Sequence, residues 1–113
     1  MSGITTHVLD TARGRPASGV PVRLEILSQD GWRLLGRAAT DEDGRTPQLL
    51  SLGSVLSPGV YRLTFDLDRY FANLEIEGFY PEAAVVFHVR DAARHHHVPL
   101  LLSPFGYSTY RGS

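Results

Sequence analysis

Apolar residues recur at every second position in two stretches of this chain. Residues 20–27 place valine, leucine or isoleucine at alternate positions, and residues 60–67 do the same with tyrosine, leucine and phenylalanine. A period of two puts successive side chains on opposite faces of a strand. Both stretches therefore predict half-buried β-strands.

Other short stretches are rich in β-branched or aromatic residues and are bounded by turn signals. We expect strands at residues 4–9, 32–40, 84–89, 95–103 and 105–111. The segments between them carry glycine, proline or acidic residues, which favour turns and irregular structure. These segments are residues 10–19, 30–31, 41–44 and 46–58.

Residues 68–75 have a different period. Tyr70, Phe71 and Leu74 recur at spacings of three and four, and Asp68 is a suitable N-cap, so we expect one or two helical turns. Many short strands with frequent turns and one short helix are typical of an antiparallel sandwich of two β-sheets. The sequence therefore predicts an all-β fold.

Length and composition narrow the possible partners and compartments. A chain of 113 residues suits one domain, residues 1–113. The net charge is −1 and no basic cluster is present, so nucleic acid is not an expected partner. No apolar run approaches the ~18 residues of a membrane span, and no membrane association is expected. The absence of cysteine excludes a thiolate nucleophile. The N-terminus lacks signal-peptide features, so we expect a cytoplasmic protein.

Five histidines are the first candidates for chemistry. In a strand, His95 and His97 share one face while His96 points the other way. A zinc site built from His95, His97 and His7 is permitted by this spacing. Neighbouring histidines on an exposed strand are more often polar surface, so we expect no metal. His88 is interpreted as a structural histidine on an edge strand.

Two further residues carry little information when each is taken alone. His7 lies in a predicted strand, on the same face as Thr5 and Leu9, where a single histidine is usually structural. Arg45 follows the turn that ends at Gly44, where an arginine is usually solvated. Whether His7 and Arg45 are functional candidates depends on the sequence motifs that contain them.

Four separated segments, taken in order, resemble the motifs of the transthyretin-like 5-hydroxyisourate hydrolases. They are residues 6–10, 40–45, 97–103 and 107–113. The resemblance extends over nearly the whole chain. Transthyretin itself is similar over residues 101–109, but it lacks the two histidines, the arginine and the terminal Arg-Gly-Ser.

The resemblance implies a transthyretin-like two-sheet β-sandwich of about eight strands. It also implies hydrolysis of 5-hydroxyisourate, the product of urate oxidation, to 2-oxo-4-hydroxy-4-carboxy-5-ureidoimidazoline, with no cofactor. The family assembles as a homotetramer with sites between dimers. Its motifs place catalytic roles on His7, Arg45, His97 and Ser113, and substrate contacts on His7, Arg45 and Tyr110.

The chemistry of these residue types fits such a reaction. Neutral imidazole can deprotonate water near physiological pH, so either His7 or His97 can be the base. Arg45 offers a planar fork of donors for carbonyl or anionic oxygens. Tyr110 can bond the substrate ring, and Ser113 can contribute its hydroxyl or carboxylate. The alternative is a small-ligand carrier of the transthyretin type, for which a histidine pair beside an arginine is unnecessary.

Three tail and turn features carry secondary expectations. Arg111 is expected to brace the tail by pairing with a carboxylate. Gly112 is expected to supply backbone angles that other residues resist. The acidic residues at 41–43 crowd into one turn and are expected to be solvated, so a catalytic carboxylate pair is not expected.

Overall fold

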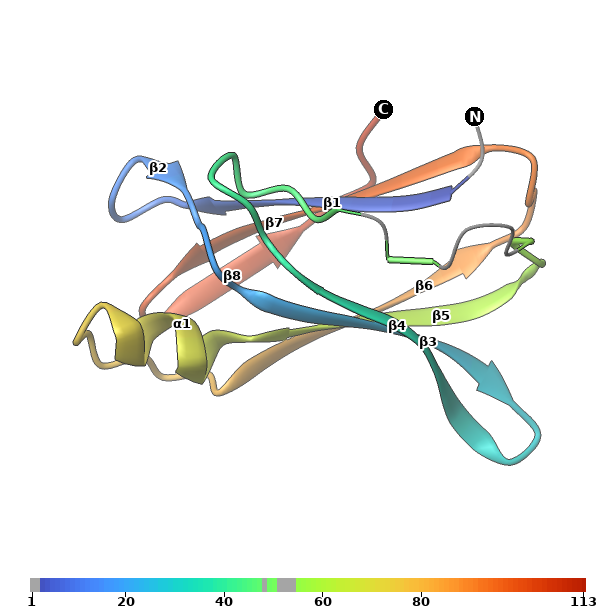
Figure 1. Cartoon of the computed structure of the whole chain (residues 1–113), viewed down its shortest axis with the longest axis horizontal. Coiled ribbons are helices and arrows are strands. Elements are labelled where there is room, and N and C mark those ends of the chain that lie inside the picture. Colours follow the sequence, from blue (N-terminus) through green and yellow to red (C-terminus); the bar gives the residue numbers. More distant parts are fainter. Residues whose placement is uncertain (1–2, 48, 51–54) are drawn as a thin grey trace.

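The computed structural model describes residues 3–47, 49–50 and 55–113, which form two four-stranded sheets packed face to face (Figure 1). One sheet has the strand order β2-β1-β7-β8 and the other β4-β3-β5-β6. The first sheet contains β1 (Gly3–Asp10), β2 (Arg15–Pro16), β7 (His95–Ser103) and β8 (Gly106–Thr109). The second contains β3 (Pro21–Ser28), β4 (Gly31–Ala39), β5 (Gly59–Asp66) and β6 (Glu82–Val89).

The predicted fold class is confirmed, with eight strands and one short helix in the described residues. The strand predicted at 95–103 has those bounds in the structure. The two-residue strand β2 lies inside a segment predicted to be a turn, because so short a pairing leaves no periodic pattern. Residues 46–58 were predicted to be irregular, and the described part of this segment forms no regular strand before Gly59. Positions 48 and 51–54 lie outside the described residues.

The sheets are mostly antiparallel, but β1 and β7 pair in parallel. Their register sets Thr5 opposite His97 and His7 opposite Pro99. Paired residues on neighbouring strands point to the same side of a sheet. The histidine of β1 and the outward histidines of β7 therefore share one face, although about ninety positions separate them in the sequence.

The alternation predicted for β1 is present in the burial of its side chains. The inward residues Ile4, Thr6, Val8 and Asp10 are all buried. The outward residues are only half-buried. The inward face packs on the core, which leaves the opposite face of this sheet available to a ligand or another chain.

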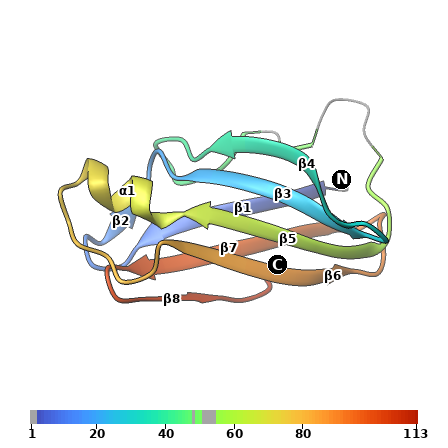
Figure 2. The same cartoon turned by 90° about the horizontal axis from the view of Figure 1, so that it is seen from below.

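The helix α1 (Leu67–Asn73) closes one end of the sandwich, as seen from below in Figure 2. Its N-cap is Asp66, whose carboxylate accepts from the Arg69 N–H at 2.9 Å. The prediction of Asp68 as the cap was wrong, because Asp68 lies in the first turn. Across the described residues, no helix has the length and apolar character needed to span a bilayer.

Candidate active site

The turn at residues 41–44 is fixed onto β1. The Asp41 Oδ1 accepts from the backbone N–H of Asp43 at 2.9 Å and of Arg45 at 3.1 Å. The Val8 N–H donates to the Gly44 carbonyl at 2.7 Å. Gly44 has φ of +78°, and a Cβ there would collide with the Val8 carbonyl. Only glycine allows this close contact between the turn and β1, which places Arg45 beside β1.

His7 is bound to the same turn. Its Nε2 lies 2.7 Å from the Asp43 carbonyl oxygen. A carbonyl only accepts hydrogen bonds, so Nε2 carries the hydrogen and donates. In the neutral ring the lone pair is then on Nδ1. His7 also forms an isolated antiparallel bridge with Arg45, which makes the two residues direct neighbours.

His97 is half-buried on the outward face of β7. Burial lowers its pKa below the usual value of 6.5, and the positive charge of Arg45 lowers the pKa further. His7 and His95 act in the same direction. A cationic neighbour disfavours the imidazolium form. His97 is therefore neutral at physiological pH and able to accept a proton.

The C-terminal tail crosses His97. The Gly112 N–H donates to the His97 carbonyl at 2.9 Å. A Cβ built on Gly112 would lie 2.5 Å from the His97 Cδ2 and 3.3 Å from the Pro99 Cγ. Gly112 is not among the residues with positive φ. The expectation that it supplies unusual backbone angles was therefore wrong, and its role is to let the tail pass close over the imidazole.

The turn, the tail and the two strands border an open cavity of about 430 Å³ on the outer face of β1 and β7. It is lined by Thr5, Thr6, Arg45, Thr46, His95, His97 and Ser113. Three residues selected from the sequence, Arg45, His97 and Ser113, thus line one space. His7 borders it through its bridge to Arg45.

Tyr110 does not line this cavity within one chain. It is 57% exposed and lines a second cavity of about 310 Å³, together with His96 and Arg111. Among the described residues, Arg111 makes no ion pair, so the expected pairing with a carboxylate is absent. His96 points to the opposite face from His95 and His97, as alternation predicted, and is buried there. Burial lowers the pKa of His96, and Arg111 adds to the effect.

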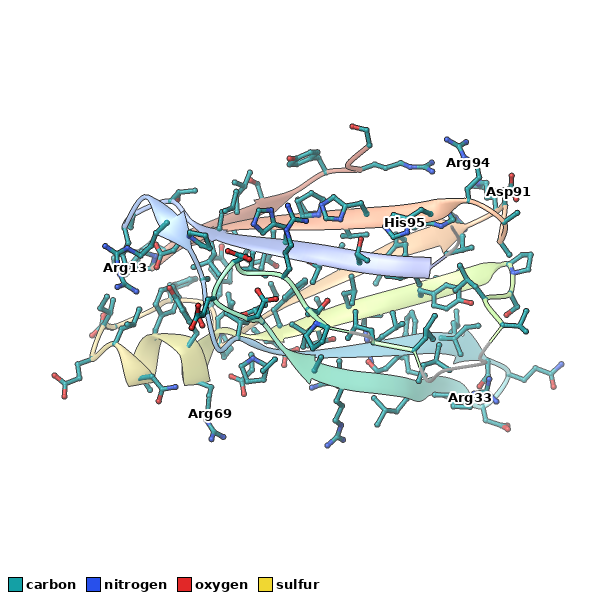
Figure 3. All side chains as sticks on the ribbon, turned by 45° about the horizontal axis from the view of Figure 1, so that its top comes forward. Arg13, Arg33, Arg69, Asp91, Arg94 and His95 are labelled. Atoms are coloured by element: carbon teal, nitrogen blue, oxygen red, sulfur yellow. The ribbon has the colours of Figure 1, made fainter. Side chains whose placement is uncertain are left out.

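The remaining histidines have simpler surroundings. His88 is exposed on β6, an edge strand of the second sheet. His95 begins β7, near Asp91 and Arg94 and at the opposite end of the molecule from Arg13 (Figure 3). No three histidine, cysteine or acidic side chains of the described chain are grouped so that they could hold a metal ion.

Sequence reasoning missed Thr5 as a site residue. Its Oγ1 lies 2.7 Å from the His95 Nε2 and 2.8 Å from the His97 Nδ1. Alternation already put Thr5 on the same face as His7, which was an available signal. No signal in the sequence indicated the pairing of β1 with β7, which brings the threonine to the two histidines.

The chain is similar to known proteins over nearly its whole length. A sequence model of the HIUase/Transthyretin family matches residues 4–112. The 5-hydroxyisourate hydrolase of Mus musculus is 48% identical over 114 residues, covering 99% of this chain and 96% of that protein. The structure of Klebsiella pneumoniae 5-hydroxyisourate hydrolase is 34% identical with a TM-score of 0.83, covering 97% of this chain and 98% of that one.

A transthyretin has the same backbone. The crystal structure of transthyretin from Sparus aurata is 31% identical, has a TM-score of 0.91 and covers 99% of this chain and 97% of its own. Because proteins with both names share the fold, the backbone alone does not separate a hydrolase from a transthyretin. The side chains on the outer face of β1 and β7 have to make that distinction.

Proposed function

Since the chain belongs to the HIUase/Transthyretin family, we propose that it is a 5-hydroxyisourate hydrolase whose active site is the outer face of β1 and β7. One observation carries the proposal. A neutral histidine with a lowered pKa, His97, shares a cavity with the guanidinium of Arg45, and His7 lies beside both. This set supplies a base and a stabiliser for negative charge, which are the two groups that amide hydrolysis requires.

His97 is the better candidate for the base. The Nε2 of His7 donates its hydrogen to the Asp43 carbonyl oxygen and so cannot accept a proton. The Nδ1 of His97 contacts Thr5, and within the described residues its Nε2 makes no hydrogen bond. The lowered pKa keeps His97 unprotonated at neutral pH. Nε2 of His97 is thus the ring nitrogen available to a water molecule in the cavity.

The reaction can then be written in two steps. The water oxygen bonds to the ring carbonyl carbon while the His97 Nε2 takes a proton, and the carbonyl oxygen becomes an oxyanion next to Arg45. When the carbon–nitrogen bond breaks, the oxyanion returns to a carbonyl and His97 gives its proton to the leaving nitrogen. The fork of Arg45 fits the oxygens of a planar heterocycle. Ser113, at the rim of the cavity, supplies a further polar contact.

We also propose that the protein works as a homotetramer with sites between dimers. The support is the open form of the cavity in a single chain, together with Tyr110, whose side chain is 57% exposed and lies outside that cavity. Assembly would close the site and allow Tyr110 to contact substrate from another subunit.

The match of the family model to residues 4–112 supports a single domain. A cytoplasmic location is the remaining part of this proposal, and a chain without cysteine suits a reducing compartment.

The alternative is a carrier that binds small ligands on the same face. The test is to add purified protein to freshly generated 5-hydroxyisourate and follow the ultraviolet absorbance. We expect decay faster than the spontaneous rate, in proportion to protein concentration and with many turnovers per chain. Binding without acceleration would support the carrier and refute the hydrolase.

A further inference from the structure

The hydroxyl of Thr5 lies between two imidazole rings. Its Oγ1 is 2.7 Å from the His95 Nε2 and 2.8 Å from the His97 Nδ1. Both distances are those of good hydrogen bonds. The geometry follows from the parallel register, which sets Thr5 opposite His97, and from the strand period, which puts His95 on the same face.

Counting hydrogens restricts what these contacts can be. A hydroxyl has one hydrogen to donate and can accept with its lone pairs. Thr5 can therefore donate to only one of the two ring nitrogens. The other nitrogen must carry its own hydrogen and donate to Oγ1, because two lone pairs at this distance would repel. The tautomers of His95 and His97 are thus linked through Thr5.

Two arrangements of neutral rings place the hydroxyl hydrogen of Thr5 in one of these two contacts; a third, in which both rings donate to Oγ1, also leaves the hydrogen of His97 on Nδ1. If Thr5 donates to the His97 Nδ1, then Nε2 of His97 carries the hydrogen and cannot accept a proton from water. If the His97 Nδ1 donates to Thr5, then Nε2 is bare and the Thr5 hydroxyl donates to the His95 Nε2. The second arrangement is the one that leaves His97 a bare nitrogen for a water molecule in the cavity that it shares with Arg45.

We propose that Thr5 is a positioning residue that holds His97 in its Nδ1–H tautomer, with His95 as the acceptor that orients the Thr5 hydroxyl. The proposal rests on the proposed function, in which the His97 Nε2 is the base. His95 is exposed, so water can satisfy its other ring nitrogen. As His97 becomes cationic, its hydrogen bond to Thr5 becomes charge-assisted and stronger, which stabilises the transition state rather than the substrate complex.

Two substitutions at Thr5 separate the hydroxyl from the shape of the side chain. Thr5→Val keeps the β-branched outline suited to a strand and removes the hydroxyl. Thr5→Ser keeps the hydroxyl. We expect kcat to fall by roughly 10- to 100-fold in the valine variant, the range found when a hydrogen-bond partner that orients a metal-bound histidine is removed. KM should change little, and the serine variant should recover most of kcat.

His95→Ala tests the second contact and should lower kcat by less than Thr5→Val, because His97 can still donate to the hydroxyl. Ser28→Ala is the matched control. It removes a hydroxyl that donates to the Gly31 carbonyl at 2.7 Å in the β3–β4 hairpin of the other sheet. Its kcat should equal that of the wild type. All four variants are compared with the wild type by melting temperature and sedimentation.

The deciding readout is ¹⁵N NMR of the histidine rings, since a bare and a protonated ring nitrogen have distinct chemical shifts. We expect the hydrogen of His97 on Nδ1 in the wild type and in Thr5→Ser, and movement toward Nε2 in Thr5→Val. A wild-type His97 with its hydrogen on Nε2, or unchanged kcat in a folded Thr5→Val variant, would overturn the proposal. If the wild type fails to hydrolyse 5-hydroxyisourate, the proposed function is lost, while the NMR result still decides the tautomer.

Discussion

Replacing Gly112 by alanine adds one methyl group where the tail crosses His97. The new Cβ would lie 2.5 Å from the His97 Cδ2 and 3.2 Å from its Cγ. Carbon atoms in contact normally lie about 3.5–4.0 Å apart. The imidazole or the tail must therefore move by about 1 Å. A misplacement of this size can cost ~10²-fold in rate.

The folded state should be affected much less than the rate. Gly112 lies after the last strand and has no positive φ, so alanine adds no backbone strain beyond the contact with His97. We expect kcat/KM for 5-hydroxyisourate to fall by roughly 100-fold. The melting temperature should fall by less than about 5 °C, the shift that corresponds to ~1 kcal/mol in a domain of this size.

Gly106→Ala, at the start of β8, is the matched control. A Cβ there meets nothing closer than the Ser103 Oγ at 3.8 Å, and Gly106 has no positive φ. This variant should keep wild-type turnover. Steady-state kinetics and thermal melts of the two variants form the assay. Wild-type kcat/KM in Gly112→Ala would show that the position of His97 under the tail does not matter for catalysis.

Three further predictions concern the turn and the titration of the site. Arg45→Lys keeps the charge but loses the fork, so kcat/KM should fall by ~10- to 100-fold with little change in melting temperature; equal kinetics would leave Arg45 as a point charge. Burial, followed by the charges of Arg45, His7 and His95, lowers the pKa of His97. Protonation inactivates the base, so kcat/KM should hold down to pH 6.5 and fall only as the pH drops through that lowered pKa. If kcat/KM, corrected for spontaneous decay of the substrate, falls with a midpoint above pH 6.5, His97 is not the base. Asp41→Ala removes the acceptor for two N–H groups of the turn, so melting temperature and kcat/KM should fall together, whereas Glu42→Ala beside it should change neither; a fall in Glu42→Ala alone would show that the turn is held differently.

Much of the fold was predictable because period and turn chemistry are local properties. The strand at residues 95–103 was predicted with its observed bounds, and alternation correctly turned His96 away from His95 and His97. The helix was predicted, but its cap was placed at Asp68 instead of Asp66 because either aspartate could precede the apolar spacing. Local pattern fixes the type of an element more firmly than its first residue.

The rest of the site depends on contacts that no local pattern contains. The parallel pairing of β1 with β7 joins segments about ninety residues apart, and it brings Thr5 to His95 and His97. The steric role of Gly112 likewise appears only once the tail lies over His97. Motif resemblance selected His7, Arg45 and His97 as candidates, but the tautomer of each ring depends on neighbours supplied by the fold.

We have proposed that His7 and His97, on the outer face of β1 and β7, support hydrolysis of 5-hydroxyisourate. The most direct test measures kcat for His97→Ala and His7→Ala beside the wild type, with folding and assembly checked in each sample. General acid–base catalysis typically contributes ~10²- to 10⁴-fold. We expect a loss in that range for His97→Ala, and a substantial loss for His7→Ala. A folded His97→Ala protein that turns over substrate at near the wild-type rate would show that His97 is not the base.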